Sequence, residues 1–571
     1  MFRFLNIFFV FFLSVFALSS QQVILDEDFN DWSETNIVSF ADSRGDASFT
    51  GIDFSDVKIS NDEDHLFLYV DLSKEINIQS SNNITLYIDA DNNANTGLSK
   101  NGIGAEIVYF FGARNGIYYG PTFTRQIFHN DINLITLPTV TSDRFEMSLT
   151  RRFTYGNAET VMGNSIKVIL SDETINGDRA PNQNGGYAYN FDNSIKNNYP
   201  TFTINKQDPN HVRFMSYNVL RDNLFEPFTQ GAFRRIFEAT KPDIIGFCEI
   251  YDYSSQQTAD RVQAYLPTTG TEKWYNAEVN PDIRVVSRYP IIDKRSIDGN
   301  GAFLIDLGTK QIVFIVVHFP CCENDFDRQR EVDNLMAFVR NVRFGISPFQ
   351  VAQNTPIVIC GDTNLVGLRA QQQTIITGDI NNNIAYGIDF DPDWDDTALE
   401  DAKPIVTNLP STFTWNNPNG SFSAGRLDYV FYTGSVLQLK NAYSLWTPSL
   451  NSAELSSSGL LISDVGVASD HLPVICDFSI DGISSVSENS INDKSIKFTQ
   501  TEDEITVHFD QKIVGNQKII LSDVTGRVIQ QHTVYSSDVQ KVIYTKNLVK
   551  NSIYILSVMD KSGFRSVRFY W

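Results

Sequence analysis

Cysteine is scarce in this chain, with five residues in 571 and no Cys-x-x-Cys pair. A disulfide framework of the small secreted kind is therefore excluded, and so is a structural zinc site built on paired thiolates. Cys248, Cys360 and Cys476 lie in apolar runs typical of strands, where we expect them to be small buried hydrophobic residues. Cys321 and Cys322 are adjacent. A vicinal disulfide between them is a further hypothesis.

Positive charge is also in short supply. The chain has 45 Lys and Arg against 68 Asp and Glu, a net charge of −23 at pH 7. This balance argues against a protein held on nucleic acid by a broad basic surface. It does not exclude a hydrolase that meets a polyanion through a bound metal cation.

Long hydrophobic runs are absent after the first 20 residues. The start of the chain has one positive charge at Arg3, a short apolar core and the small residues Ser19 and Ser20. This pattern predicts a signal peptide over residues 1–20. A bilayer-spanning helix is less favoured, because the run is shorter than the roughly 20 residues that a membrane requires. We expect a mature chain without a transmembrane segment, secreted or displayed at the cell surface.

Residues 21–203 read as short alternating strands separated by Asn, Asp and Gly. Leu66–Leu72 and Ile84–Asp89 are representative, and no helical period is sustained, so this unit is predicted to be a β-sandwich. The loop after the second strand places oxygen side chains on alternate residues, which is what a calcium site requires. The candidate ligands are Asp89, Asp91, Asn93 and Asn95. An ordinary Asn-rich turn explains the same pattern equally well.

The same unit carries a loose resemblance to a known module. The Asp31-Trp32 pair, the Asp-x-Asp loop and Gly104-Ala105-Glu106 are similar to the β-sandwiches of family-nine carbohydrate modules. The resemblance implies a polysaccharide partner, although a spacer without any ligand fits it too.

In residues 211–480, strands alternate with a few helices, which predicts an α/β unit. Several of the strands that look buried end in a polar side chain. A carboxylate is expensive to bury alone, so each must reach solvent, a partner or a cation. Their convergence would form a site for a divalent metal and a phosphate. These strand ends are Asn218, Glu249, His318, Asp362, Asp428 and the triplet Ser469-Asp470-His471.

Seven phrases in this unit resemble, in order, those of the endonuclease/exonuclease/phosphatase superfamily. They are Met215–Asn218, Pro242–Glu249, Val286–Pro290, Val317–Phe319, Gly361–Asn364, Arg426–Tyr429 and Ser469–Pro473. Any one of them alone is an ordinary strand end or turn. The resemblance implies a four-layer α/β sandwich that hydrolyses phosphate esters with Mg²⁺ or Mn²⁺.

Metal ligation is assigned first to Glu249, with Asn218 and Asp470 beside it. Oxygen ligands of this kind hold Mg²⁺ in an octahedron that keeps several waters. The resemblance supports these roles.

The remaining polar strand ends are candidates for proton transfer and phosphate binding. Asp428 and His471 form a predicted dyad in which the carboxylate orients the imidazole, and His318 is a second imidazole facing the phosphate or leaving group. The resemblance implies that Asp362 orients or deprotonates the attacking water. It also implies that Asn364 donates a hydrogen bond to the phosphate.

A last β-rich unit is predicted over residues 490–571. The phrase Leu521–Arg527 resembles the C-terminal sorting domain of the type IX secretion pathway. This implies that the secretion machinery is a partner of the tail. A plain β-sandwich appendage is the alternative.

Three functions from different classes follow. The first is a secreted, Mg²⁺-dependent phosphodiesterase of nuclease type that hydrolyses extracellular nucleic acid. The second is a lipid or inositol phosphohydrolase, similar to sphingomyelinases. The third is a surface-displayed glycan-binding protein with an inert middle unit.

Overall fold

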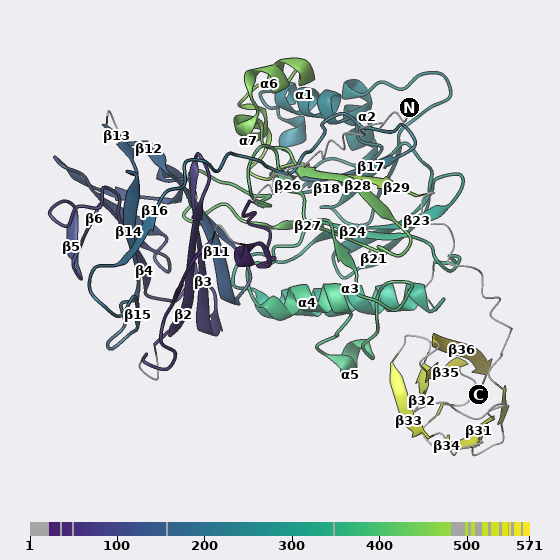
Figure 1. Ribbon diagram of the computed structural model, residues 1–571. Coiled ribbons are helices and arrows are strands. Elements are labelled where there is room, and N and C mark those ends of the chain that lie inside the picture. The colour runs from purple at the N-terminus through teal and green to yellow at the C-terminus, as the bar shows by residue number, and fades with distance from the viewer. Residues whose placement is uncertain are drawn as a thin grey trace, which may run out of the picture.

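The computed structural model describes five long stretches of the chain and a set of strand segments near its C-terminus (Figure 1). They are residues 22–34, 37–47, 51–155, 158–346, 349–480 and segments between 497 and 570. The predicted signal peptide and residues 524–526 of the C-terminal sorting phrase lie outside them. Among the described residues, no helix has both the length and the apolar character needed to cross a membrane.

The N-terminal unit consists of antiparallel sheets. One sheet has the order β1 (Val38–Ala41), β2 (Phe54–Asn61), β3 (His65–Ile76), β11 (Ser142–Thr150) and β10 (Ile135–Leu137). The second has the order β15 (Arg179–Ala180), β14 (Ser165–Asp172), β4 (Ile84–Asp89), β7 (Ile107–Phe110), β8 (Asn115–Tyr119) and β9 (Thr124–Ile127), with β16 (Tyr187–Asn190) also on β14. Two hairpins complete the unit, β5 (Leu98–Lys100) with β6 (Ile103–Ala105) and β12 (Arg152–Tyr155) with β13 (Ala158–Val161). One core contains inward side chains of both large sheets, such as Leu68 and Leu86.

The middle unit contains two further mixed sheets. The first has the order β19 (Tyr275–Glu278), β20 (Arg284–Ser287), β18 (Ile244–Cys248), β17 (Val212–Asn218), β29 (Val474–Ser479), β28 (Gln438–Ser444) and β26 (Ile405–Val406). The second has the order β21 (Ile291–Ile297), β22 (Asn300–Asp306), β23 (Gln311–His318), β24 (Ile357–Asp362), β27 (Asp428–Tyr432) and β25 (Glu400–Asp401). Side chains from both sheets, among them Phe214 and Phe314, share one core. The chain is thus a mixed, sheet-rich α/β protein.

Helices cover the outer faces of these two sheets. On the first sheet, the apolar face of α1 (Gln230–Thr240), formed by Phe233, Ile236 and Phe237, is buried in a core that also holds α2 (Ser255–Tyr265). On the second sheet, α3 (Asp325–Arg343) buries Val332, Leu335 and Met336. The other helices in the described part of the chain are α4 (Arg369–Thr377), α5 (Asn383–Tyr386), α6 (Ser452–Ser458), α7 (Asp464–Ala468) and the 3₁₀ turns η1 (Asp31–Ser33), η2 (His129–Asp131), η3 (Asn223–Phe225) and η4 (Thr447–Ser449).

The C-terminal segments form two small antiparallel sheets. One contains β30 (Lys497–Gln500), β31 (Glu504–His508) and β34 (Gln540–Tyr544), and the other contains β33 (Val528–Val534), β32 (Gln517–Asp523), β35 (Ile553–Asp560) and β36 (Gly563–Tyr570). They share a core that includes Ile505, Leu521 and Leu556.

The register of the middle sheets brings polar strand ends together. β23 and β24 run parallel with His318 beside Asp362, and β27 runs antiparallel with Asp428 beside Asp362. In the first sheet, Asn218 pairs with Cys248, the residue before Glu249. Strand ends that are far apart in the sequence therefore meet at one edge.

The N-terminal unit is joined to the middle unit by specific contacts. Leu25 forms a parallel bridge with Ser411, and the amide of Thr141 donates to the carbonyl of Gly367 at 2.8 Å. The carboxylate of Glu27 accepts hydrogen bonds from Gln372 at 2.9 Å and from the hydroxyl of Tyr429 at 3.1 Å. The first unit thus contacts the segment that follows Asp362 and the residue after Asp428.

Candidate active site

The imidazole of His471 is held by a buried carboxylate. Its Nδ1 lies 2.8 Å from Oδ2 of Asp428, and its backbone amide donates to the hydroxyl of Ser469 at 3.1 Å. Burial alone would lower the pKa of His471, but the carboxylates of Asp428 and Asp362 outweigh it and raise this pKa to about 10. The structure therefore assembles the dyad that the sequence predicts, with a ring that keeps its proton at neutral pH.

A second imidazole–carboxylate pair lies across the site. Nδ1 of His318 is 2.7 Å from Oδ2 of Asp282. Burial lowers the pKa of His318, whereas the hydrogen bond to Asp282 and the charge of Asp362 raise it, to about 9 on balance. The sequence did not predict a role for Asp282, because Asn280-Pro281-Asp282 is typical of an ordinary turn and nothing in it indicates a contact with His318.

Asp362 lies between the two rings. Its Oδ2 is 3.6 Å from Nε2 of His318 and 3.6 Å from Nε2 of His471. The same oxygen accepts a hydrogen bond from the side-chain amide of Asn218 at 3.0 Å. Its side chain is almost completely buried, so an anion bound here would meet two protonated imidazoles at a site shielded from bulk water.

Gly361 allows strands β23 and β24 to lie close enough for His318 to reach Asp362. Its φ is +136°, and a Cβ built on it would lie 1.9 Å from the carbonyl oxygen of Val317 on the neighbouring strand. Any side chain at this position would push β24 away from β23 and separate His318 from Asp362.

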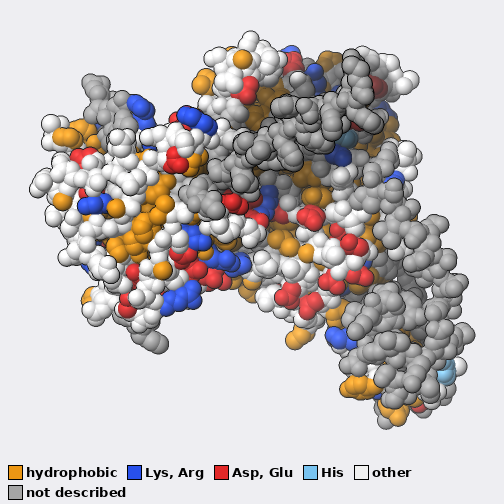
Figure 2. All heavy atoms as spheres, in the orientation of Figure 1, with side chains coloured by type: hydrophobic (Ala, Val, Ile, Leu, Met, Phe, Trp, Pro, Cys, Tyr) orange, Lys and Arg blue, Asp and Glu red, His pale blue; other side chains and the backbone are white. Residues whose placement is uncertain are grey.

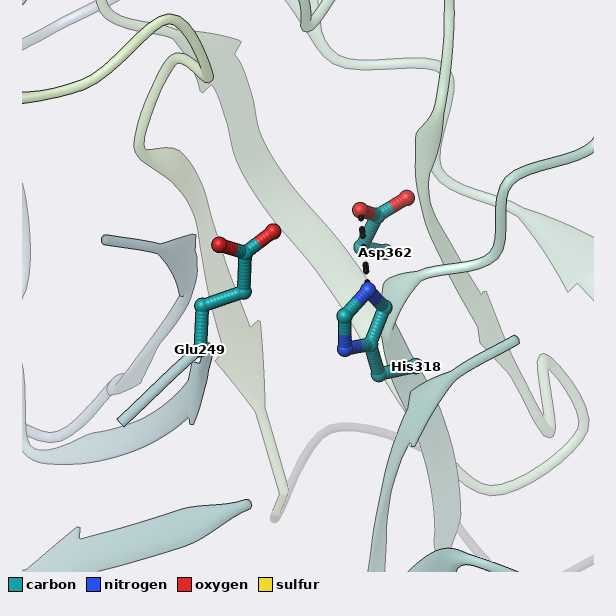
Figure 3. Close-up of side chains that lie close together, drawn as sticks. All are labelled: Glu249, His318 and Asp362. Carbon is teal, nitrogen blue, oxygen red and sulfur yellow. Dashed lines mark ion pairs between the residues drawn. The ribbon is translucent and has the colours of Figure 1, made fainter. Parts of the chain in front are cut away.

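Glu249 faces the same space from the other sheet (Figure 3). Figure 3 shows Glu249, His318 and Asp362 around a common space, with one ring nitrogen of His318 directed at Asp362. The Glu249 carboxylate accepts hydrogen bonds from the side chain of Asn218 at 3.0 Å and from the amide of Arg221 at 2.9 Å. Glu249 adopts a left-handed φ of +63°, a strained conformation for a non-glycine residue, and its amide donates to Asp282 at 2.7 Å.

Two predicted site residues have other surroundings. Asp470 is absent from the close groups of ligand atoms: its Oδ2 accepts from the indole N–H of Trp415 at 3.1 Å, and its Oδ1 is buried without a partner. The hydroxyl of Ser469 donates to the carbonyl of Asn218 at 2.9 Å, which fixes this segment beside the end of β17. Asn364 uses one side-chain N–H to bind the carbonyl of Phe319 at 3.0 Å, so only its second N–H is free for a phosphate.

The donor set fits a hard divalent cation. Ligand atoms of Glu249, His318 and Asp362 lie within 4.8 Å of one another. The two carboxylates are the groups that can bind a cation, because the raised pKa of His318 keeps its ring protonated. The buried Oδ1 of Asp470 is a further oxygen that lacks a hydrogen-bond partner. Carboxylate oxygens in this arrangement are ligands that Mg²⁺ accepts.

The cysteines are all free thiols. Cys248, Cys360 and Cys476 are buried in the sheets, which confirms that part of the prediction. Cys321 and Cys322 are exposed, with no disulfide between them.

Two of the four candidate ligands of the predicted calcium loop lie beside a third carboxylate. Ligand atoms of Asp89 and Asp91 lie within 4.8 Å of one another and of the carboxylate of Glu106. Asn93 and Asn95 are exposed, and the side-chain oxygen of Asn93 accepts from the amide of Asn95 at 3.1 Å within the turn.

On the face drawn in Figure 2, the Lys and Arg side chains of the described residues occur in small groups among acidic ones.

Comparison with known proteins identifies the middle unit. Residues 215–471 match the family described as the Endonuclease/Exonuclease/phosphatase family. No curated protein matches the chain.

Similar solved structures cover the same part of the chain. The human nocturnin catalytic domain with bound sulfate is 18% identical, with a TM-score of 0.31, and the match covers 47% of this chain and 94% of that one. D. rerio TDP2 complexed with a single-strand DNA product is 13% identical, with a TM-score of 0.31 and coverage of 48% and 100%. ANGEL2, a 2′,3′-cyclic phosphatase, is 16% identical, with a TM-score of 0.32 and coverage of 47% and 96%. Likenesses at this level carry no argument about the substrate.

Proposed function

We propose that this chain, which carries an endonuclease/exonuclease/phosphatase domain over residues 215–471 and is thus a phosphoric ester hydrolase, is a Mg²⁺- or Mn²⁺-dependent phosphodiesterase of nuclease type. One observation supports it above the others. Asp362 lies 3.6 Å from each of two imidazoles, and a carboxylate backs each ring. A site of this kind suits a phosphodiester, which needs an oriented water, shielding of its non-bridging oxygens and protonation of its leaving oxygen.

The metal would be held by Glu249 together with Asn218 and Asp470, and when bound it supplies positive charge to the phosphate oxygens. Asp362 orients the attacking water and accepts its proton through the carboxylate. The protonated rings of His318 and His471 donate hydrogen bonds to phosphoryl oxygens, and either can pass a proton to the leaving oxygen. Asp282 and Asp428 keep the two rings oriented and charged.

Nucleic acid is the proposed substrate even though the protein is acidic, because the site itself supplies the positive charge that a polyanion needs. With a net charge of −23, the chain cannot rely on general electrostatic attraction to a polyanion. A cation and two imidazolium rings concentrate the attraction at the scissile phosphate.

The test is hydrolysis of plasmid and single-stranded DNA and of RNA by the purified full chain, with Mg²⁺ and with EDTA. We expect cleavage only with the metal, and a loss of at least about 100-fold in rate for Asp362→Ala and for His471→Ala. Asp379→Ala, an exposed carboxylate of the same unit, is the matched control and should leave the rate unchanged.

Two outcomes would contradict the proposal. If no nucleic acid is cleaved while phosphate or phosphocholine is released from inositol phosphates or sphingomyelin, the second candidate function replaces it. If both variants turn over normally, the roles assigned to Asp362 and His471 are wrong.

We further propose that the middle unit is a four-layer α/β sandwich flanked by two β-sandwiches, divided at about residues 21–203, 211–480 and 490–571. The cores between the two sheets and between each sheet and its helices support this division. Export through a signal peptide and a type IX sorting domain, to the exterior or the cell surface, rests on the sequence phrases alone.

A further inference from the structure

Three carboxylates meet at one end of the N-terminal unit, far along the chain from the proposed active site. Asp89 is the last residue of β4, Asp91 follows in the loop, and Glu106 lies between β6 and β7. One oxygen of each lies within 4.8 Å of the others. Asp89 and Glu106 are buried, with exposed fractions of 0% and 6%, whereas Asp91 is exposed.

Backbone amides fix the two buried carboxylates. Asp89 accepts from the amide of Asn93 at 2.9 Å and from that of Gly104 at 3.3 Å. Glu106 accepts from the amide of Ala90 at 2.8 Å through Oε2. The amides therefore hold the carboxylates of Asp89 and Glu106 in place beside Asp91.

The other oxygen of Glu106 has no hydrogen-bond partner. Oε1 is buried and unpaired. The nearby hydroxyl of Thr96 lies within hydrogen-bond distance of Asp91, at 3.0 Å, and of the carbonyl of Asn93, at 2.8 Å. A buried carboxylate oxygen without a donor is costly, and two neighbouring carboxylates increase the cost.

A cation removes this cost. Ca²⁺ takes six to eight oxygen ligands and accepts mono- or bidentate carboxylates in irregular geometry, whereas Mg²⁺ requires a regular octahedron. Three carboxylates offer up to six oxygens, two of the side chains are already ordered, and exposed Asp91 leaves a path from solvent.

We propose that Asp89, Asp91 and Glu106 form a calcium site that stabilises the N-terminal unit. This ligand set adds Glu106 to the loop residues Asp89 and Asp91. The ion would join β4 to the β6–β7 junction and so tie the loop at 90–97 to the sheet. The site is independent of the proposed hydrolase activity.

The test measures thermal unfolding and hydrogen exchange of the full chain after chelation, with and without added Ca²⁺. Saturating Ca²⁺ should raise the Tm of the N-terminal unit by about 5 °C or more and slow the exchange of the amides of Ala90 and Asn93. Glu106→Gln should lose most of both effects. In the absence of Ca²⁺, the same variant should be at least as stable as the wild type, because it lacks the buried unpaired charge.

Controls separate this site from the proposed active site and from general charge effects. Glu63→Gln removes an exposed carboxylate of the same unit and should keep the full Ca²⁺ response. Glu249→Gln alters the proposed catalytic metal site and should also keep it. If Glu106→Gln fails to fold, the exposed residue Asp91 provides a second variant, Asp91→Asn.

The proposal is overturned if Ca²⁺ leaves the wild type unchanged, or if Glu106→Gln or Asp91→Asn responds as the wild type does. A response to Mg²⁺ equal to that to Ca²⁺ would overturn the assignment of the ion.

Discussion

Replacing Asp282 by Asn tests how the second imidazole is charged. The substitution keeps a side chain that can accept the hydrogen bond from His318 but removes the negative charge 2.7 Å from its Nδ1. In the wild type, this carboxylate and Asp362 together overcome burial and raise the pKa of His318 from 6.5 to about 9. A shift of this size corresponds to roughly 3 kcal/mol in favour of the protonated ring.

The sign of the effect on the pH profile follows directly. A ring with a raised pKa stays protonated as pH rises, and loses its proton only as the pH passes that pKa. The activity that depends on this proton should therefore fall on the alkaline side near pH 9 in the wild type. In Asp282→Asn the fall should begin about one to two pH units lower, since Asp362 still contributes part of the shift.

The assay is kcat/KM for DNA hydrolysis between pH 5 and 10 at saturating Mg²⁺. At neutral pH we expect a loss of about 10- to 100-fold, the usual scale for a residue that orients another. Asp252→Asn, which removes an exposed carboxylate of the loop after Glu249, is the matched control and should keep the wild-type profile. If the alkaline limb of Asp282→Asn coincides with that of the wild type, the role given to Asp282 is refuted.

Two further predictions concern the scaffold of the site. Gly361→Ala should abolish activity or unfold the middle unit, because the new Cβ would lie 1.9 Å from the carbonyl oxygen of Val317. Circular dichroism measures folding, and the DNA assay measures activity. A folded, active variant would contradict the close approach of β23 and β24. Glu27→Ala should lower the free energy of unfolding by about 3 kcal/mol or more, because it leaves buried Arg426, whose guanidinium is 3.6 Å away, with one carboxylate fewer. Urea denaturation is the measurement, and a loss under about 1 kcal/mol would mean that the N-terminal segment contributes little to the middle unit.

The polar strand ends could be predicted because their signal is local. An apolar run that ends in a charged or amide side chain, as at Glu249 or Asp362, indicates a buried strand with a polar end whatever the rest of the chain does. The dyad of Asp428 and His471 could be predicted only through the resemblance of ordered phrases. The structure joins these two residues at 2.8 Å across 43 positions.

The contacts of other site residues could not be predicted from the local sequence. Asp282 lies in a turn and meets His318 because the turn before β20 faces the end of β23. Glu106 belongs to the phrase Gly104-Ala105-Glu106, which gives no sign that its carboxylate lies beside those of Asp89 and Asp91. Glu27 precedes the first strand of the N-terminal unit but binds Tyr429 of the middle unit.

The amino-acid sequence by itself determined where strands end and which end in carboxylates, amides or imidazoles, because burial and side-chain chemistry act residue by residue. The tertiary structure alone decided which of these groups face one another. Strand register and the docking of the two units set those distances, and both depend on pairings between segments far apart in the chain.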